Sequence, residues 1–426
     1  MLGGGTFVTQ NKVLPGAYIN VVSTKSASAI LSDRGIVTMP LELDWGVAGE
    51  IFEVSASNFL KNSLKIFGYS YNHEKMKGLR DLFKNTSTLY AYRLNGGGAK
   101  ASNTYATAKF TGVRGNDIKI VIQENVDDPN YFDVKTVIDD IVVDLQTVGS
   151  MTELVENDFV VFESTAIIAS TPGLALSGGT NEAYETQSHQ TYLDLIESYS
   201  FNTMGVVAVQ EEIKSLYVNF CKRMRDEIGA KFQVVLYNKA ADYEGVINVK
   251  NSVDLVYWVT GVEAGCAINK STTNKKYDGE FVVNVDYTQS QLEMAIESGE
   301  FTLHKVGTEI RVLEDINSLV TVTAEKGDVF KDNQTIRVVD QISNDIAVLF
   351  NTKYLGSIPN NASGRISFWT DVVKHHEQMQ NIRAIEDFSD KDVTVEAGEG
   401  KNSIVVNDAI KTISAMTKLY MTTMVQ

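Results

Sequence analysis

The pattern of apolar and polar positions predicts alternating strands and helices in the central part of the chain. Residues 204–209 form a short, wholly apolar run, which is typical of a strand buried on both faces. Apolar side chains then recur at helical spacing from Ile213 to Ile228, and Gly229 supplies a helix stop. Residues 232–237 predict the next strand. This stretch is therefore expected to form a βαβ unit with parallel strands.

Further elements of an α/β domain are predicted on both sides of this unit. Residues 35–43 and 88–94 predict short strands, with helical segments around 55–66 and 75–84 between them. Residues 282–285, Val-Val-Asn-Val, predict a strand that continues the sheet.

A helix and a hairpin are expected to follow. Thr288 and Gln291 have the spacing of a capping box, which predicts a helix that ends at Gly299. The runs FTLHKV and EIRVL, separated by Gly307 and Thr308, then predict a β-hairpin.

An all-β segment interrupts this α/β pattern. Residues 104–168 contain five β-rich runs separated by turn-prone Gly, Asn and Asp. Glycine-rich joints bracket the segment at 96–98 and at 177–179, after a closing Thr171-Pro-Gly173. We therefore expect a β domain inserted into an α/β domain that resumes afterwards.

The end of the chain has a different character. Two helices are predicted near 335–352 and 363–388, and residues 393–397 and 403–406 predict a hairpin. Residues 416–425 form an extended, β-tolerant tail with no predicted core after it.

The start of the chain has a similar extended segment at 13–22, in which Pro15 favours an edge or a detached arm. Strands without a sheet leave their main-chain groups unpaired. Each end is therefore expected either to add a strand to another copy of the protein or to pair with its own domain.

Composition and charge restrict the class of protein. The chain has 426 residues and a formal charge of -16, and residues 101–200 alone hold 4 basic and 16 acidic side chains. Such a balance argues against a nucleic-acid partner and favours a solvated acidic surface on this segment. With 2 cysteines the chain has neither a disulfide framework nor a four-cysteine zinc site. No apolar run spans a membrane and no secretory signal is present, so assembly in the cytoplasm is expected.

The sequence offers no motif for catalysis. It contains no G-x-S-x-G elbow, no phosphate-binding G-x-x-x-x-G-K-[ST] loop and no complete H-E-x-x-H motif. His375 and His376 are adjacent, so on a helix their side chains point about 100° apart, which disfavours a shared metal. We therefore expect no catalytic residue, no metal and no cofactor.

Short matches spread in order over about nine-tenths of the chain give it a resemblance to the contractile tail sheath proteins of myophages, R-type bacteriocins and phage-like particles. The matching segments are Pro15-Gly-Ala-Tyr18, Gly261-x-x-Ala-Gly265, Ser271-Thr-Thr273 through Gly279, Leu292 through Gly299, Phe301 through His304, Asp315 through Leu319, Ile336-Arg-Val-Val-Asp340, Tyr354-Leu-Gly356, Asn360-Asn361, Gly364-Arg365 and Lys418-Leu-Tyr-Met421. Ser318 stands where threonine is expected.

The resemblance implies a fold with several parts. It implies a subtilisin-like α/β core without protease activity, an inserted outer β domain, an α+β C-terminal domain that faces a tail tube, and extended terminal arms. The expected boundaries are 1–22 for the first arm, 23–95 and 178–325 for the core, 96–177 for the insertion, 326–410 for the C-terminal domain and 411–426 for the second arm.

The resemblance also implies how copies are linked. Arm strands of two subunits add to a hairpin of a third, so the subunit forms a helical homopolymer around a tail tube and contracts without nucleotide hydrolysis. The expected arm residues are Tyr18, Ile19, Val21, Leu419, Tyr420, Met421 and Met424. The expected acceptor residues are Val393, Val395, Ile404 and Val405. The polar side of the 363–388 helix, with Lys374, His375, Gln378 and Arg383, is the candidate tube contact, although a solvated helix face explains it equally well.

The expected function is thus that of a sheath subunit that drives a tube through a bacterial envelope. Its expected partners are further copies, the tail tube protein, and baseplate and tail terminator proteins, with no nucleic acid and no membrane bound. It is expected to assemble in the bacterial host cytoplasm and to end in a virion or phage-tail-like particle. Two alternatives stay open at this point: a hydrolase on an α/β scaffold and a cell-surface adhesin.

Overall fold

The computed structural model describes residues 31–425. These residues divide into two compact units. The larger unit consists of residues 32–344, 379–387 and 410–425, and the smaller unit consists of residue 31 with residues 345–378 and 388–409. Each unit has its own apolar core.

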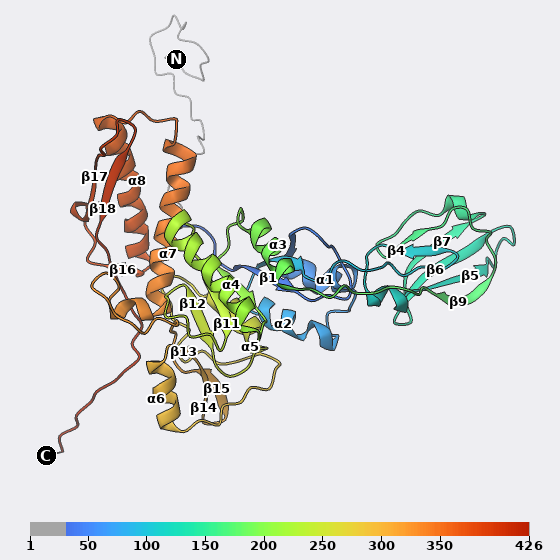
Figure 1. Cartoon of the computed structure of the whole chain (residues 1–426), viewed down its shortest axis with the longest axis horizontal. Coiled ribbons are helices and arrows are strands. Elements are labelled where there is room, and N and C mark those ends of the chain that lie inside the picture. Colours follow the sequence, from blue (N-terminus) through green and yellow to red (C-terminus); the bar gives the residue numbers. More distant parts are fainter. Residues whose placement is uncertain (1–30, 426) are drawn as a thin grey trace, which may run out of the picture. The chain divides into compact units, whose positions relative to one another are not determined.

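A seven-stranded sheet forms the centre of the larger unit (Figure 1). Its strand order is β13-β12-β11-β10-β1-β3-β2, and all neighbours pair in parallel except β2 and β3. The bounds are β1 Ile36–Leu41, β2 Phe52–Ser55, β3 Thr88–Arg93, β10 Thr203–Val206, β11 Gln233–Tyr237, β12 Val246–Val249 and β13 Glu300–Phe301.

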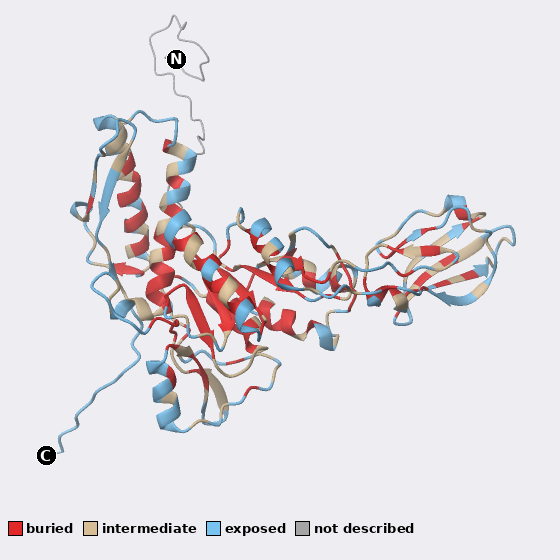
Figure 2. Cartoon of the chain, in the orientation of Figure 1, coloured by how far each residue is buried: buried red, intermediate tan, exposed pale blue. Residues whose placement is uncertain are grey.

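Helices cover both faces of this sheet, as the parallel strands require. One apolar cluster joins strand residues such as Met39 to α1 (Ala56–Phe67), α2 (Lys77–Phe83) and α5 (Leu255–Gly265). A second cluster joins residues such as Met204 to α3 (Thr186–Ile196) and α4 (Glu211–Lys222). Figure 2 shows the strands and the inner sides of these helices as buried. The expected mixed α/β fold is therefore confirmed in its broad form.

The predicted βαβ unit is confirmed as β10, α4 and β11. A π-helical turn, Arg223–Ile228, follows α4, and Gly229 ends it in the left-handed region with φ of 91°. The predicted strand at 282–285 is wrong, since these residues have no regular structure. Val282 is 97% exposed, whereas β12 and β13 take the sheet positions beyond β11.

The segment after the sheet follows the sequence pattern closely. The helix α6 (Gln289–Glu297) begins with the predicted capping box of Thr288 and Gln291. The strands β14 (Leu303–Val306) and β15 (Glu309–Val312) form the predicted hairpin.

The insertion consists of two small antiparallel sheets that share one apolar core. One sheet pairs β4 (Ala106–Ala108) with β8 (Val160–Phe162). The other has the order β7-β6-β5-β9. Its strands are β5 Lys119–Glu124, β6 Phe132–Ile138, β7 Ile141–Val148 and β9 Thr171–Ala175. The Thr171-Pro-Gly173 segment, expected to close the insertion, lies in the edge strand β9, where a proline costs no ladder hydrogen bond.

The last part of the chain contains two long helices and two strand pairs. These elements are α7 (Asn333–Leu349), α8 (Ala362–Asn381), β16 (Ile385–Glu386) paired with β19 (Lys411–Thr412), and β17 (Val393–Ala397) paired with β18 (Ile404–Asp408). The remaining short helical turns are Glu74–Met76, Val113–Asp117, Met151–Glu153, Asp328–Lys331, Phe350–Tyr354 and Asp390–Asp392.

The second long helix is shorter than predicted, since α8 ends at Asn381 instead of residue 388. Arg383 has φ of 61°, which ends the helical geometry, and the Ala384 N–H donates to the Met379 carbonyl. The apolar residues beyond this point, such as Ile385, belong to a strand.

Candidate assembly site

The predicted acceptor hairpin exists as β17 and β18 and has two distinct faces. Val393, Val395 and Ile404 lie on one face and pack with the apolar cluster of the smaller unit. Val405 points to the opposite face, together with Thr394, Glu396 and Asn407, and all four are exposed. Three of the four expected acceptor side chains therefore pack the hairpin against the core of the smaller unit. Of the four, only Val405 is exposed to solvent.

Both outer edges of this hairpin carry main-chain groups without partners in the described part of the chain. The Gly398 N–H donates to Ser403 O and the Ala409 N–H donates to Asp392 O, which fixes the alternation of the ladder. Residues 394 and 396 therefore bond across the hairpin, whereas residues 395, 397, 404 and 406 direct their N–H and C=O groups outward. An outward-facing, unpaired edge is the geometry that accepts an added strand.

Helix α8 holds the hairpin in place by two polar contacts within the smaller unit. The Trp369 Nε1–H donates to Val393 O at 2.9 Å, which occupies the first outward carbonyl of β17. His376 Nε2 lies 2.9 Å from Asp408 Oδ2 at the end of β18. His376 is completely buried. No sequence signal indicated that Trp369 contacts Val393 or that Asp408 contacts His376.

The expected C-terminal arm leaves the fold after Ala415. The Ala415 N–H donates to Gln334 Oε1 at 3.0 Å, and no residue from 416 to 425 makes a hydrogen bond to the described part of the chain. The apolar side chains of this tail, Met416, Leu419, Tyr420, Met421, Met424 and Val425, are all at least 77% exposed. Figure 2 shows this segment as exposed throughout. The first residues of the expected arm, Lys411 to Ala415, therefore pair with their own chain through β19 and Gln334, whereas residues 416–425 form no strand with the described part of the chain. Tyr18, Ile19 and Val21 of the expected N-terminal arm lie outside the described residues.

The four residues expected to face a tube do not share one surface. Lys374 is exposed and Gln378 is partly buried, and both belong to α8. His375 is fully buried, with its Nε2 3.0 Å from Asp345 Oδ2, so its expected presentation to a partner is wrong. Arg383 is exposed but lies beyond the end of the helix. The helix is packed on more of its circumference than its polar sequence indicates.

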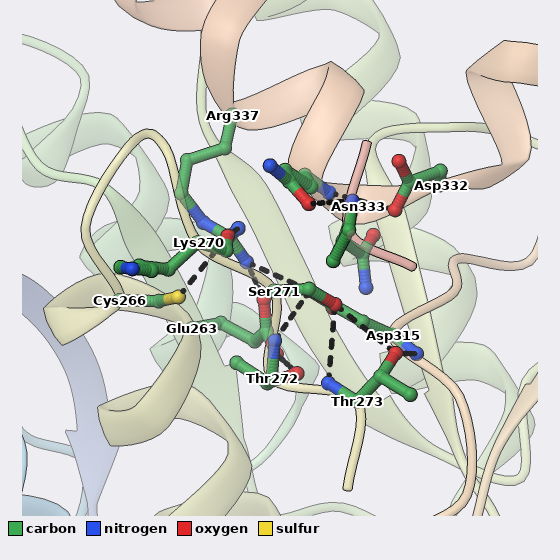
Figure 3. Close-up of polar contacts among 12 residues, drawn as sticks. Glu263, Cys266, Lys270, Ser271, Thr272, Thr273, Asp315, Asp332, Asn333 and Arg337 are labelled. Atoms are coloured by element: carbon green, nitrogen blue, oxygen red, sulfur yellow. Dashed lines mark hydrogen bonds and ion pairs between the residues drawn. The ribbon is translucent and has the colours of Figure 1, made fainter. Parts of the chain in front are cut away.

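A buried ion-pair network lies near the root of the C-terminal arm, within the larger unit. Figure 3 shows side chains of α5, α7 and two connecting loops that converge there. Arg337 Nη2 lies 2.5 Å from Glu263 Oε2 and 3.3 Å from Asp315 Oδ2, and Nη1 donates to Lys270 O at 2.8 Å. Thr272 donates from its hydroxyl to Glu263 and from its N–H to Asp315.

Burial sets the protonation behaviour of this network. Burial, with Asp315 adding a like charge, raises the pKa of Glu263 to about 8. Burial also lowers the pKa of the neighbouring Arg34 to about 10, with Arg337 contributing. Burial alone would raise the pKa of Asp315, but Arg337 and the hydrogen bonds from Thr272 hold it below the ordinary value. The sequence matches at 261–265, 271–273, 315–319 and 336–340 all contribute residues to this network or to the helix that carries it.

A pocket of about 600 Å³ in the larger unit is lined mainly by polar and charged side chains. Its lining includes Glu42, Asp44, Lys75, Asn181 and Tyr184. Asp44 accepts from Asn181 at 2.8 Å and forms an ion pair with Lys75. Burial would raise the pKa of Asp44, but these donors lower it below its ordinary value. This carboxylate is held by internal contacts and is a poor candidate for a general base.

His189 and Cys221 are two further reactive side chains, and both are buried in the core. His189 is buried, its Nδ1 lies 2.7 Å from the Tyr217 hydroxyl, and burial lowers its pKa to about 4. Burial raises the pKa of the Cys221 thiol to about 12. Within residues 31–425 no cluster of three or more His, Cys, Asp or Glu side chains could hold a metal ion. No helix of that part of the chain is long and apolar enough to cross a bilayer.

Four family models match consecutive parts of the chain. They are the Gp18 domain III N-terminal region of tail sheath protein over residues 34–94, the phage tail sheath β-sandwich domain over 95–181, the phage tail sheath central domain over 182–318 and the phage tail sheath C-terminal domain over 325–426. The order of these matches agrees with the sheets and helices described above.

Individual proteins are similar over nearly the full length. The phage-like element PBSX protein XkdK of Bacillus subtilis is 33% identical, over 98% of this chain and 99% of that protein. The crystal structure of a sheath tail protein from Desulfitobacterium hafniense is 37% identical with a TM-score of 0.81, and the match covers 89% of this chain and 93% of that one. The sheath of the anti-feeding prophage in its contracted state shares the fold, with a TM-score of 0.58 at 12% identity over 97% of this chain and 99% of that one.

The hydrolase and adhesin alternatives are not favoured by these similarities, which all point to one structural role. The chain belongs to the phage tail sheath protein family and is a structural subunit of a contractile tail sheath.

Proposed function

We propose that copies of this subunit are linked by strand exchange, in which terminal arms of neighbouring copies add to the two free edges of the hairpin formed by β17 and β18. The single observation that carries the proposal is that one chain contains both a hairpin with unpaired edges and an exposed apolar tail that pairs with no described strand. The outward edge groups at Val395, Ala397, Ile404 and Val406 have no partners within the described residues, and the tail at 416–425 exposes its apolar side chains.

The energetics of such a contact are favourable but moderate. An added strand that forms about five hydrogen bonds gains roughly 1 kcal/mol net for each. Apolar side chains that become buried add about 1.5–3 kcal/mol each, and ordering each residue of the tail costs about 1–2 kcal/mol. A link of this kind holds neighbours together while weaker surfaces rearrange, so no nucleotide hydrolysis is needed in the proposed contraction.

Proline substitutions distinguish the outward edge from the inner ladder. In Val406→Pro the lost N–H faces the free edge of β18, whereas in Val405→Pro the lost N–H bonds to β17. We expect V406P to keep the thermal stability of the isolated subunit and to lose tube formation in negative-stain microscopy. The matched variant V405P is expected to lower the melting temperature of the subunit.

Truncation tests the donor. Removal of residues 416–426 is expected to leave a folded subunit, because the tail makes no hydrogen bond to the described fold, and to prevent tube formation. Tubes of normal length from either the truncated subunit or V406P would contradict strand exchange. Tyr18, Ile19 and Val21 are proposed as the second donor, and removal of residues 1–22 is the corresponding test.

Further parts of the proposal concern the setting of the subunit. Lys374 and Gln378 of α8 remain the proposed tube-facing residues, together with Arg383 beyond the helix. The proposed partners are the tail tube protein, a baseplate and a tail terminator, with assembly in the bacterial host cytoplasm. A parallel sheet with helices on both faces supports the subtilisin-like description of the core, and the domain boundaries given above are proposed with it.

A further inference from the structure

Three polar side chains form a stripe along the first half of helix α7. Gln334, Arg337 and Gln341 are spaced three and four residues apart, so they lie on one face of the helix. All three are at least 96% buried. We call this stripe the α7 anchor face. Each of its members contacts a different part of the larger unit.

The C-terminal arm root is bound at the first member. The Gln334 Nε2 donates to Ile413 O at 2.9 Å, and its Oε1 accepts from the Ala415 N–H at 3.0 Å. The hydroxyl of Ser414 donates to Asp332 Oδ2 at 3.2 Å. One side-chain amide thus pairs with the backbone of two alternate residues, as a neighbouring strand would. The last fixed residues before the exposed tail are therefore held by the start of α7.

The segment that leads to the N-terminal arm is bound at the third member and at α5. The Gln341 Nε2 donates to the Ser32 hydroxyl at 2.6 Å. Two residues later, Arg34 donates to Cys266 O at 3.0 Å and to Glu263 O at 3.1 Å. The backbone oxygen of Glu263 therefore contacts the N-terminal root, while its carboxylate contacts Arg337.

Buried ion pairs fix this face of α7 to the core. Arg337 lies between the two root contacts and pairs with Glu263 and Asp315 (Figure 3). One turn further along, Asp340 forms a bidentate pair with Arg225, with distances of 2.6 and 2.8 Å. Removal of one partner from such a buried pair leaves an uncompensated charge, so the helix is expected to tolerate little displacement here.

We propose that the α7 anchor face is a common anchor for the roots of both terminal arms, with Arg337 as the positioning residue that couples them through Glu263. The proposal rests on the proposed function, because it assigns the anchor a role only where the arms bind neighbouring copies. When a neighbouring copy displaces one arm, the Arg337–Glu263 pair then transmits the displacement to the root of the other arm. The binding of one arm to a neighbour is thereby coupled to the binding of the other arm.

Hydrogen exchange of the unassembled subunit tests the coupling directly. Arg337→Lys keeps the charge but loses the fork that bonds Glu263, Asp315 and Lys270 at once. We expect the rates of amide exchange at residues 32–36 and at residues 411–415 to rise together, by about tenfold or more. The thermal unfolding of the subunit should remain one cooperative transition. The matched control Arg80→Lys removes the fork of the Arg80–Glu280 pair in the same unit and is expected to change exchange at neither root.

A second variant keeps the test decisive if R337K does not fold. Glu263→Gln preserves the side-chain size and replaces one of the two carboxyl oxygens that accept hydrogen bonds from Arg337 and Thr272, and it is expected to raise exchange at both roots to a smaller degree. Faster exchange at one root alone, or at neither, in the folded variant would overturn the common anchor. This readout does not require tubes: failure of strand exchange appears as normal tubes from V406P, whereas failure of the anchor appears in the exchange of the free subunit.

Discussion

His376 and Asp408 connect a helix to the end of a strand in the smaller unit. His376 Nε2 lies 2.9 Å from Asp408 Oδ2, and the Nδ1 of the same ring lies 2.9 Å from the Val372 carbonyl oxygen. Both ring nitrogens thus lie within hydrogen-bond distance of an oxygen atom. Because Asp408 stands opposite Val393 in the hairpin register, this contact holds the open end of the hairpin against α8.

Removal of the Asp408 carboxylate should therefore destabilise the smaller unit. Asp408→Ala leaves a fully buried imidazole without its acceptor, and we expect it to lower the free energy of unfolding by about 1–3 kcal/mol. Asn407→Ala, on the exposed face of the same strand, serves as the control and should change it by less than about 0.5 kcal/mol. Urea titration measures both. Equal stabilities of the two variants would show that the pair contributes nothing.

Acid should destabilise the subunit through His189. Burial lowers the pKa of His189 to about 4 in the folded chain, so the unfolded chain binds a proton that the folded chain does not between the ordinary value of about 6.5 and pH 4. The free energy of unfolding is expected to fall as pH falls through this window, by at most about 1.4 kcal/mol per pH unit from this group. Above pH 6.5, His189 is neutral in both the folded and the unfolded chain, so it no longer changes the free energy of unfolding with pH.

The contribution of His189 is isolated by His189→Gln, which cannot titrate and can still contact the Tyr217 hydroxyl. Urea titrations between pH 4 and 7 should give a shallower slope for this variant than for the natural chain. Parallel pH profiles of the two proteins would assign the acid sensitivity to other groups.

Close packing of α5 against the end of α2 should make Gly261 intolerant of a side chain. A Cβ at this position would lie 2.4 Å from the Leu82 carbonyl oxygen, a backbone atom that cannot turn aside. Gly261→Ala is expected to cost about 1–3 kcal/mol through overpacking. Gly327→Ala, where no atom lies within 4 Å of the added Cβ, is the matched control and should be nearly neutral. Thermal unfolding compares them, and similar melting temperatures would contradict the packing argument.

The proposed tube contact can be separated from the folding of α8. Lys374→Glu reverses an exposed charge, and we expect it to reduce co-sedimentation with the tail tube protein while the melting temperature stays unchanged. Lys391→Glu, an exposed reversal elsewhere in the smaller unit, should leave co-sedimentation intact. His375→Ala is expected instead to destabilise the subunit, because the buried ring contacts Asp345. Full tube binding by K374E would remove this residue from the proposed contact.

Sequence patterns predicted the elements whose signals are local. The helical spacing from Ile213 onward, the capping box of Thr288 and the turn at Gly307 each depend on neighbouring residues, and each appears as expected. The helix α5 was not predicted because nine of its eleven residues are buried, so it lacks a polar face to mark its period. The predicted strand at 282–285 is wrong because a strand needs an adjacent strand for its main-chain hydrogen bonds. The apolar composition of the segment does not show whether such a strand is available.

The candidate site was predictable in outline and not in its details. The hairpin follows from β-rich runs around a glycine turn, but which of its faces packs on α8 depends on tertiary contacts. Val393 and Val405 have the same side chain and lie on opposite faces, one buried and one exposed. His375 was assigned to the polar face from its chemistry, whereas the structure buries it beside an aspartate distant in sequence.

The indole of Trp369 makes the two edges of the hairpin unequal. On β17 the outward carbonyl of Val393 is already taken, which leaves residues 395 and 397 for an incoming strand, whereas β18 offers 404, 406 and 408. A strand added to the edge of β17 therefore forms a shorter ladder than a strand added to the edge of β18. Under the proposed exchange, the two strand-binding edges of one subunit are therefore different from each other. A polymer built from identical copies then has a direction.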